Sequence, residues 1–301
     1  MDVHGLTSRS ALLAAGVSDD ELARWCAKGE LVRIARGAYL PAAEAEGIDR
    51  AARHALEVRA ALARLRIPVA ASHVSAAVLH GLPVWDVPLD RVHLTRASPG
   101  SVRRSARLHL HGTGLADDET ELLAGCHATT VARTVVDIAR TEPFEQAVAV
   151  ADAALRAGLV APASLAHARR RARHRCGATA AGRVVEFADG RAESVGESRS
   201  RVALRRHGLP RPELQWEVRG GGRLIGRVDF GWPARRVVGE FDGRVKYTRG
   251  SRDDAAAVVW AEKRREDALR AVGLRVVRWT WADLADFDAV AARLRAALGI
   301  S

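Results

Sequence analysis

The hydrophobic and polar positions in the last third of the chain predict a compact α/β unit. A helical pattern over about residues 195–207 precedes three runs, ELQWEVR, RLIGRVDF and RRVVGEFDG, in which apolar and polar residues largely alternate as they do along strands. A helical pattern over about 254–272, a further strand-like run and an amphipathic helix follow. The predicted order is helix, three strands, helix, strand and helix.

The N-terminal part of the chain follows a different pattern, that of two helices and a small hairpin. Ser18 and Glu21 have the spacing of a capping box, and apolar residues then recur on one face of a helix. The run LVRIARGAYL predicts two short strands that are joined at Arg36–Gly37. Two helices followed by a β-wing are typical of a winged helix-turn-helix, which we predict for residues 1–45.

The segment between these two parts combines helical and strand-like patterns. The runs RVHLTR and ARLHLH alternate as strands, and long apolar-periodic segments predict helices around them. The arginine-rich run 168–183 is either a solvated helix end and linker or a contact for phosphates. The sequence therefore predicts an α/β multidomain protein with a winged helix-turn-helix over 1–45, a central mixed α/β domain over 46–188 and a third domain over 189–301.

Histidines in the central region invite a metal hypothesis: they are His73, His80, His93, His109 and His111. Their spacing matches no zinc-ligand signature, and histidines in strands or helix caps are far more common than histidine ligands. We therefore predict no metal site among them.

The charge of the chain points to a polyanionic partner. The formal net charge is +11 and the sequence pI is about 10.8, which favours nucleic acid before membrane as a partner. Arg24 and Lys28 on the second helix of the winged region, with Arg33 and Arg36 on its wing, are the candidate DNA contacts. The alternative for this region is a small structural cap, because its basic and acidic residues nearly balance.

The cysteines and the hydropathy of the chain bear on its compartment. Cys26, Cys126 and Cys176 are far apart and form no CxxC pair, which is typical of reduced thiols. No apolar run approaches the length of a membrane span, and the N-terminus MDVHGLTSRS lacks the apolar core of a signal peptide. We expect a soluble cytoplasmic protein with no membrane partner.

Two acidic residues of the predicted C-terminal sheet are expected to face each other. If the chain turns at residues 233–235, Asp229 and Glu240 lie on neighbouring strands with their Cβ atoms about 4.5–5.5 Å apart. Like charges at that separation destabilise a sheet unless a cation or a proton lies between them. A hard divalent ion, Mg²⁺ or Mn²⁺, suits such a pair because it takes oxygen ligands and can activate water for attack on a phosphoryl group.

The element order and the motif D-x10-E-x-D-G resemble the PD-(D/E)xK endonuclease superfamily, particularly its very-short-patch-repair-like branch. The resemblance implies a restriction-endonuclease-like αβββαβ core in which Asp229, Glu240 and the Phe241 carbonyl bind the metal. It also implies that Glu197 on the first helix adds a carboxylate to the site. Ser194 and Glu197 have capping-box spacing as well, so capping is the alternative role of Glu197.

The chain departs from the superfamily at the position of its catalytic lysine, where it has Asp242. If the site is catalytic, Lys246, or Lys263 from the following helix, takes that role. Only these two and Lys28 are lysines among the 47 basic residues, so their position near the motif is notable. Asp242 either joins the site or forms a turn with Gly243.

The front of the chain is similar to a second family, the AbiEi-like antitoxins of type IV abortive-infection systems. The stretches that carry this likeness are LTSRSALLAAGVSDDELARWCAKGELVRIARGAYLP and HVSAAVLHGLPVWDVPLDRVHLT, within about residues 5–160. The resemblance implies a winged helix that binds promoter DNA and a following domain that neutralises a nucleotidyltransferase toxin.

Three functions are compatible with these patterns. The leading hypothesis is a Mg²⁺-dependent DNA endonuclease with an N-terminal DNA-binding module, acting in phage defence or DNA repair. The second is a DNA-binding regulator or antitoxin with an inactive nuclease fold and a toxin partner, which the missing lysine favours. The third is an arginine-rich scaffold for a protein partner.

Overall fold

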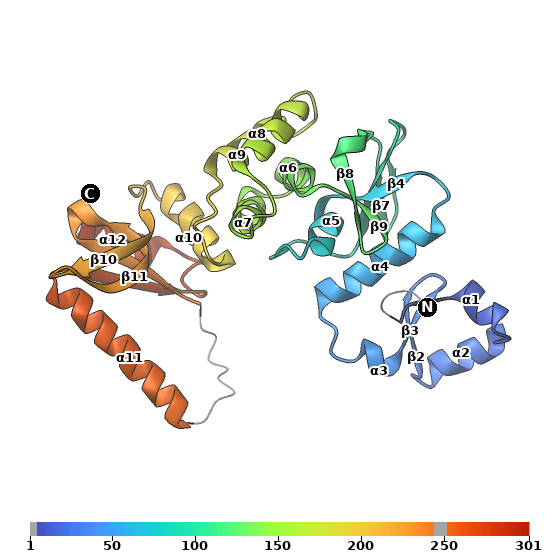
Figure 1. Ribbon diagram of the computed structural model, residues 1–301, viewed down its shortest axis with the longest axis horizontal. Helices are drawn as coiled ribbons and strands as arrows, with labels where there is room; N and C mark the ends of the chain where they lie inside the picture. Colours follow the sequence, from blue (N-terminus) through green and yellow to red (C-terminus); the bar gives the residue numbers. More distant parts are fainter. Residues whose placement is uncertain (1–4, 244–251, 301) are drawn as a thin grey trace. The chain divides into compact units, whose positions relative to one another are not determined.

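The computed structural model describes residues 5–243 and 252–300 of a mixed α/β protein (Figure 1). The chain forms two compact units, residues 1–188 and 189–301, so the winged and central regions lie in one unit. The described strands form sheets of three, four and six strands. In these described ranges, no helix has both the length and the apolar character that crossing a membrane requires.

The N-terminal part of the first unit has two helices followed by a hairpin. Its elements are β1 (Thr7–Ser8), α1 (Arg9–Ala14), α2 (Asp19–Ala27), β2 (Leu31–Ala35) and β3 (Ala38–Pro41), with the sheet order β1-β3-β2. The predicted capping box fixes the start of α2. Glu21 N–H donates to Ser18 Oγ at 3.2 Å, and Ser18 N–H donates to the Glu21 carboxylate at 2.9 Å. This winged arrangement is the one that the pattern predicts.

The helix α4 (Arg50–Arg64) joins the winged part to the rest of the first unit. Leu56 and Ala60, four residues apart, pack in one core with Leu40 of β3. Val58 lies on another side of the helix and enters the core of the central sheet. Because one helix carries side chains of both cores, the winged part and the central sheet pack as one body.

The central sheet has the strand order β6-β7-β5-β4-β9-β8. Its strands are β4 (Val69–Ala71), β5 (Val92–Arg96), β6 (Arg103–Arg104), β7 (Leu108–His111), β8 (Thr120–Leu123) and β9 (Cys126–Thr129). β5 is parallel to β7 and β4 to β9, whereas the other pairs are antiparallel. The remaining helices of the unit are α3 (Ala42–Ala45), α5 (His73–Leu79), α6 (Val131–Thr141), α7 (Phe144–Arg156), α8 (Pro162–Arg171) and α9 (Ala178–Phe187). α6 contacts α5, α7, α8 and α9, so it is the central helix of this group (Figure 1).

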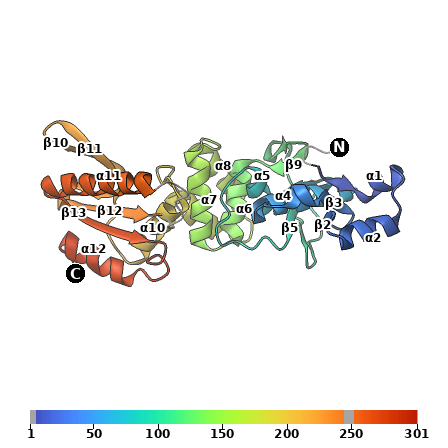
Figure 2. The ribbon, with the colours of Figure 1, turned by 90° about the horizontal axis from the view of Figure 1, so that it is seen from below.

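The second unit has a four-stranded sheet of order β10-β11-β12-β13. Its elements are α10 (Val195–Arg206), β10 (Glu213–Gly220), β11 (Arg223–Trp232), β12 (Val237–Asp242), α11 (Arg252–Ala271), β13 (Arg275–Thr280) and α12 (Asp288–Leu298), in the predicted order. β13 is parallel to β12, whereas the other two pairs are antiparallel. Side chains of α10 and α12 pack around Phe230 and Trp279, and Leu269 of α11 packs with Val228 and Val238. The two groups of helices therefore cover opposite faces of the sheet, as Figure 2 shows for α11 and α12.

Candidate functional site

The four residues predicted to contact DNA are exposed on the winged part. Arg24 lies in the last turn of α2, and Lys28 is the residue at which that helix ends. Lys28 Nζ is 4.0 Å from a carboxylate oxygen of Glu30, a contact between two exposed side chains. Arg33 lies on β2, and Arg36 lies in the turn to β3. The winged part thus presents basic side chains both at the end of its second helix and on its wing.

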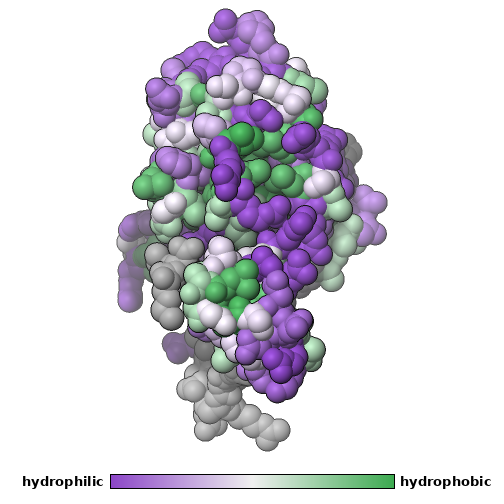
Figure 3. Space-filling view, turned by 90° about the vertical axis from the view of Figure 1, so that its right-hand side faces the viewer, coloured by the Kyte–Doolittle hydropathy of each residue, from purple (hydrophilic) through white to green (hydrophobic). Residues whose placement is uncertain are grey.

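A groove beside the wing extends this basic surface. It has a volume of about 520 Å³, and its lining combines apolar side chains with six charged ones: Arg33, Arg36, Arg53, Arg64, Arg107 and Glu57. Glu57 lies 3.6 Å from Arg53 Nε; burial raises the pKa of Glu57, and Arg53 and Arg107 oppose that increase. An excess of guanidinium groups in a concave surface raises the local concentration of anions such as phosphates. Figure 3 shows the face of the molecule that lies on the right-hand side of Figure 1, where hydrophobic areas are bordered by hydrophilic side chains.

Three of the groove arginines were not singled out by the sequence analysis. Arg53 and Arg64 are eleven residues apart on α4, which is three helical turns, so helical spacing alone places them on one face. That this face meets the wing depends on the packing of α4 against β2. Arg107 comes from the segment before β7, and no local pattern indicated it.

Asp229 lies where the ladder between β11 and β12 stops. Phe230 and Gly239 are the pair nearest to it in that ladder, and beyond them an Asp229 carboxylate oxygen accepts the N–H of Phe241 at 2.9 Å. The side chain therefore replaces a backbone carbonyl as the acceptor for β12. Burial raises the pKa of Asp229 to about 6; the Phe241 N–H opposes this increase, and the charge of Glu197 adds to it.

Glu197 is buried in the first turn of α10 and both caps the helix and approaches Asp229. One Glu197 oxygen accepts from Ser194 Oγ at 2.8 Å, and the other accepts from Glu193 N–H at 2.9 Å and Gln215 Nε2 at 2.8 Å. Burial raises the pKa of Glu197, and these hydrogen bonds oppose the increase. Gly196 permits the close approach of α10, because a Cβ there would lie 1.9 Å from the Phe241 ring. Capping of α10 explains the position of Glu197, and the charge of Glu197 also acts on Asp229.

Glu240 is held by two arginines. One carboxylate oxygen lies 2.7 Å from Arg265 Nη2, and the other lies 2.8 Å from Arg278 Nη2. The Glu240 side chain is buried, so these contacts are screened little by solvent. Guanidinium groups therefore supply the compensating charge for which the sequence analysis expected a divalent ion. That expectation overlooked arginines on α11 and β13 as a source of cations.

The structure places the remaining predicted site residues as follows. Asp242 is the last residue of β12, in register with Thr280, so it belongs to the strand rather than to a turn. Lys263 Nζ lies 5.8 Å from the ring centroid of Trp260. The cationic groups that contact Glu240 belong to Arg265 and Arg278. Lys246 lies outside the described residues. The Phe241 N–H contacts Asp229, and the role of the Phe241 carbonyl as a metal ligand stays a prediction.

As arranged, these side chains fit a Mg²⁺ or Mn²⁺ ion poorly. Such an ion takes oxygen ligands in an octahedron, and both oxygens of Glu240 already contact guanidinium groups. Among the described side chains, the group of three potential ligands with all ligand atoms within 4.8 Å of one another consists of histidines rather than of these acids. A metal at Asp229 and Glu240 would have to share the Glu240 carboxylate with Arg265 and Arg278, whose positive charges oppose the binding of a cation.

We expect Asp229→Asn to stabilise the chain at neutral pH. The folded-state pKa of Asp229, about 6, exceeds the ordinary value of 3.8, so its stabilising contribution is complete below pH 3.8 and is lost as the pH rises through 6. Asparagine can still accept the Phe241 N–H and carries no charge. The free energy of unfolding at pH 7 should therefore rise by about 1 to 3 kcal/mol, and the gain should disappear at pH 4.

The measurement is urea unfolding of the full chain, followed by tryptophan fluorescence. The exposed Glu217→Gln on β10 serves as the control and should change the free energy by less than about 0.5 kcal/mol. An Asp229→Asn gain that is the same at pH 4 and pH 7 would show that ionisation of Asp229 is not its cause.

Comparison with known proteins identifies the N-terminal part of the chain. A family model described as "Transcriptional regulator, AbiEi antitoxin" matches residues 2–42. Two uncharacterized proteins of Mycobacterium tuberculosis, from strains CDC 1551 / Oshkosh and ATCC 25618 / H37Rv, are each 42% identical to the chain over 120 residues. The match covers 40% of this chain and 44% of each relative, so the chain spans less than half the length of these curated relatives. The family match covers the winged part, and residues 2–42 are an AbiEi antitoxin-like region.

Proposed function

We propose that this protein is a DNA-binding transcriptional regulator of the AbiEi antitoxin type. The observation that carries the proposal is that the family match on residues 2–42 coincides with a winged helix whose four basic candidate contacts are exposed. In winged helix-turn-helix proteins the second helix enters the major groove and reads base edges. In this chain that helix is α2, with Arg24 and Lys28 near its C-terminal end.

The arginine groove supports a second set of contacts, to the phosphate backbone. Arg33 and Arg36 belong both to the wing and to the groove, so a duplex that touches the wing also lies close to the α4 arginines. Phosphate contacts position a protein on DNA and make its affinity depend on salt, whereas base contacts give specificity. We therefore assign sequence reading to α2 and backbone binding to the wing and the groove.

The test is fluorescence anisotropy with two labelled duplexes. One duplex carries the DNA upstream of the protein's own coding sequence, and the other is a shuffled duplex of the same composition. The upstream duplex should bind about 1000-fold more tightly or better, and its affinity should fall steeply as salt increases. Equal affinity for the two duplexes, or binding of neither at low salt, would contradict a regulatory role.

A second candidate function is a Mg²⁺-dependent DNA endonuclease in the second unit. It is favoured by the grouping of Asp229, Glu197 and Gln215 and by the raised pKa of Asp229, since shifted pKa values are frequent at functional sites. The engagement of Glu240 by two arginines weighs against it. A toxin protein as partner is likewise a proposal that comes from the family resemblance.

Incubation of the purified chain with Mg²⁺ or Mn²⁺ and several DNA substrates separates the two functions. Cleavage that is lost in Asp229→Ala supports the endonuclease, whereas cleavage retained in that variant places any hydrolytic centre elsewhere. The absence of cleavage together with specific, salt-sensitive binding of the upstream duplex leaves the regulator as the function.

A further inference from the structure

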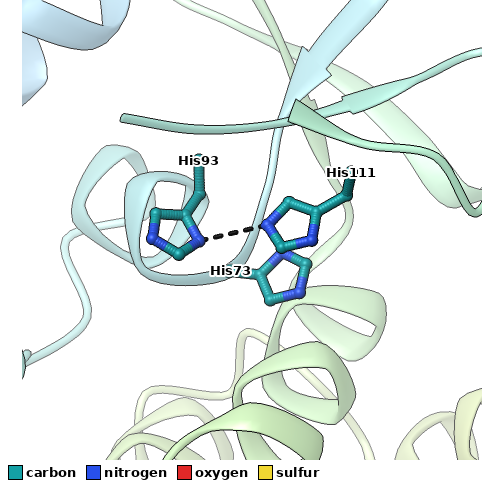
Figure 4. A group of neighbouring side chains, drawn as sticks. All are labelled: His73, His93 and His111. Atoms are coloured by element: carbon teal, nitrogen blue, oxygen red, sulfur yellow. Dashed lines mark hydrogen bonds between the residues drawn. The ribbon is translucent and has the colours of Figure 1, made fainter. Parts of the chain in front are cut away.

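Histidines from three separate elements of the first unit meet inside it. His73 begins α5, His93 lies on β5 and His111 ends β7. Their potential ligand atoms all lie within 4.8 Å of one another, and a hydrogen bond of 3.2 Å joins His93 Nδ1 to His111 Nε2 (Figure 4). These histidines match no zinc-ligand spacing along the sequence, because they come from three elements that only the folded chain brings together.

The parallel pairing of β5 with β7 explains why the two strand histidines meet. His93 is in register with His109, and Thr95 is in register with His111. Side chains two residues apart on a strand share a face, so these four residues stand on one face of the sheet. Val92, Leu94 and Leu110 stand on the other face, in the hydrophobic core. Polar and apolar positions therefore segregate cleanly across this pair of strands.

His73 reaches the same face from a strained backbone conformation. Its φ is 51°, in the left-handed region that residues other than glycine rarely adopt. Its ring stacks on His111 with centroids 3.8 Å apart, and its Nδ1 is 3.0 Å from Ser72 Oγ. Ser72 Oγ in turn accepts from Thr95 Oγ1 at 2.8 Å. Metal-binding histidines characteristically have such an outer hydrogen-bond partner, which fixes the orientation of the ring.

The three imidazoles form a mostly buried polar cluster, in which His73 is 3% exposed and His111 is 8% exposed. A neutral imidazole offers one nitrogen lone pair to a metal. His73 Nδ1 contacts Ser72 Oγ, which leaves its Nε2 as the nitrogen that can bind an ion, whereas His93 Nδ1 and His111 Nε2 share a hydrogen bond that an ion would replace.

The separation of one pair of ring nitrogens suits a tetrahedral ion, whereas the stacked rings of His73 and His111, 13° from parallel, require one ring to rotate before both can bind the same ion. With metal–nitrogen distances of about 2.0–2.1 Å, two ligand nitrogens of a tetrahedral zinc site lie about 3.3 Å apart. The separation of His93 Nδ1 and His111 Nε2 is 3.2 Å. Asp137 of α6 acts on His111 as a nearby negative charge, and its own oxygens are held by Arg133 and Arg140. Because the charges of Arg133 and Arg140 also act on His73, the imidazole nitrogens rather than this carboxylate would hold a cation.

We propose that His73, His93 and His111 bind a Zn²⁺ ion in a three-histidine site. Imidazole nitrogens without a thiolate suit Zn²⁺ and related transition metals and do not suit Mg²⁺ or Ca²⁺. His93 is half-buried, so solvent reaches one side of the cluster, and a water or a small ligand can take the fourth coordination position. The site ties β5, β7 and the start of α5 together, and zinc binding stabilises the first unit.

His109 provides a matched control within the same cluster. It stands beside His93 on the same face, and its ring stacks on His111 with centroids 3.8 Å apart. Its Nε2, however, accepts a hydrogen bond from Arg104 Nε at 3.0 Å, and it lies outside the group of three ligands. A substitution of His109 therefore changes the cluster without removing a ligand.

The experiment is calorimetric titration of the metal-free full chain, without an affinity tag, with Zn²⁺. We expect one Zn²⁺ per chain, an increase in Tm on binding, and a tetrahedral absorption spectrum when Co²⁺ replaces Zn²⁺. His93→Gln and His111→Gln should each weaken binding by about 100-fold or more, whereas His109→Gln should bind within a few-fold of the wild type. Circular dichroism of each metal-free variant establishes that it is folded.

Three results would overturn the proposal. One is a wild-type chain that takes up no stoichiometric Zn²⁺, which would make the cluster a stack of neutral imidazoles only. Another is unchanged affinity in folded His93→Gln. The third is an equal loss of affinity in His109→Gln, since that would place the ion elsewhere in the cluster.

Discussion

Arg133→Met is expected to lower the free energy of unfolding of the first unit by about 3 to 5 kcal/mol, because it leaves two buried carboxylates without their main partner. Arg133 is 2% exposed, and its Nε and Nη1 donate to Asp137 at 2.7 Å and to Glu119 at 2.8 Å. Its Nη2 also donates to Thr113 Oγ1 at 3.2 Å. Methionine fills a similar volume as the arginine stem, so loss of packing contributes little to this effect.

The lower end of that range applies if other arginines neutralise part of the charge of the two carboxylates in the variant. Arg140 still donates to Asp137 at 2.8 Å, and Arg171 remains 3.6 Å from Glu119. Urea unfolding followed by circular dichroism measures the change. The control is Asp118→Asn, which breaks a partly exposed ion pair with Arg171 and should cost less than about 1 kcal/mol. A loss below 1 kcal/mol in Arg133→Met would mean that Arg140 and Arg171 neutralise the site on their own.

The quadruple variant Arg24→Ala, Lys28→Ala, Arg33→Ala, Arg36→Ala is expected to lose DNA affinity by about 100-fold or more. All four side chains are exposed on the winged part, so the substitutions remove charge without removing core packing. Each lost phosphate contact reduces the slope of log affinity against log salt by about 0.9. The slope should therefore fall by up to about 3 to 4 if all four residues contact phosphates, and by less if α2 contacts bases.

Two double variants distinguish contacts to phosphates from contacts to bases. Arg33→Ala with Arg36→Ala should weaken binding to upstream and shuffled duplexes alike, whereas Arg24→Ala with Lys28→Ala should reduce the preference for the upstream duplex. The control is Arg156→Ala with Arg293→Ala, which removes the same charge from exposed positions outside the winged part. If the control pair weakens binding as much as the wing pair, the effect reflects net charge rather than a defined interface.

Local patterns in the sequence were sufficient for the secondary structure that surrounds both candidate sites. The capping box at Ser18 set the start of α2, and the period-2 alternation gave β10, β11 and β12. The turn at residues 233–235 brought Phe230 opposite Gly239, which put Asp229 and Glu240 next to each other along the two strands. These features depend on residues a few positions apart, and such short-range interactions can be recognised in a sequence.

The partners of the charged residues could not be found in the same way. Glu240 is paired with Arg265 of α11 and Arg278 of β13, which follow it by more than twenty residues. Arg133 and Asp137 are four residues apart on α6, a spacing that is compatible with an exposed or a buried pair, and α6 buries them with Glu119 because it is the central helix of its group. A helix's sequence shows which residues share a face, but neighbouring elements determine whether that face is buried.

The sequence alone determined the two helices and the hairpin of the N-terminal part and the order of elements in the second unit, because caps, turns and hydrophobic periods are local. Only the tertiary structure decided which charges compensate one another and which histidines meet. The Asp229 carboxylate accepts the backbone N–H of Phe241, and the Glu240 carboxylate pairs with two arginines. The side chains of His73, His93 and His111 meet in one cluster. Strand register and helix docking place these groups within hydrogen-bonding distance, and the resulting electrostatic interactions decide what each site can bind.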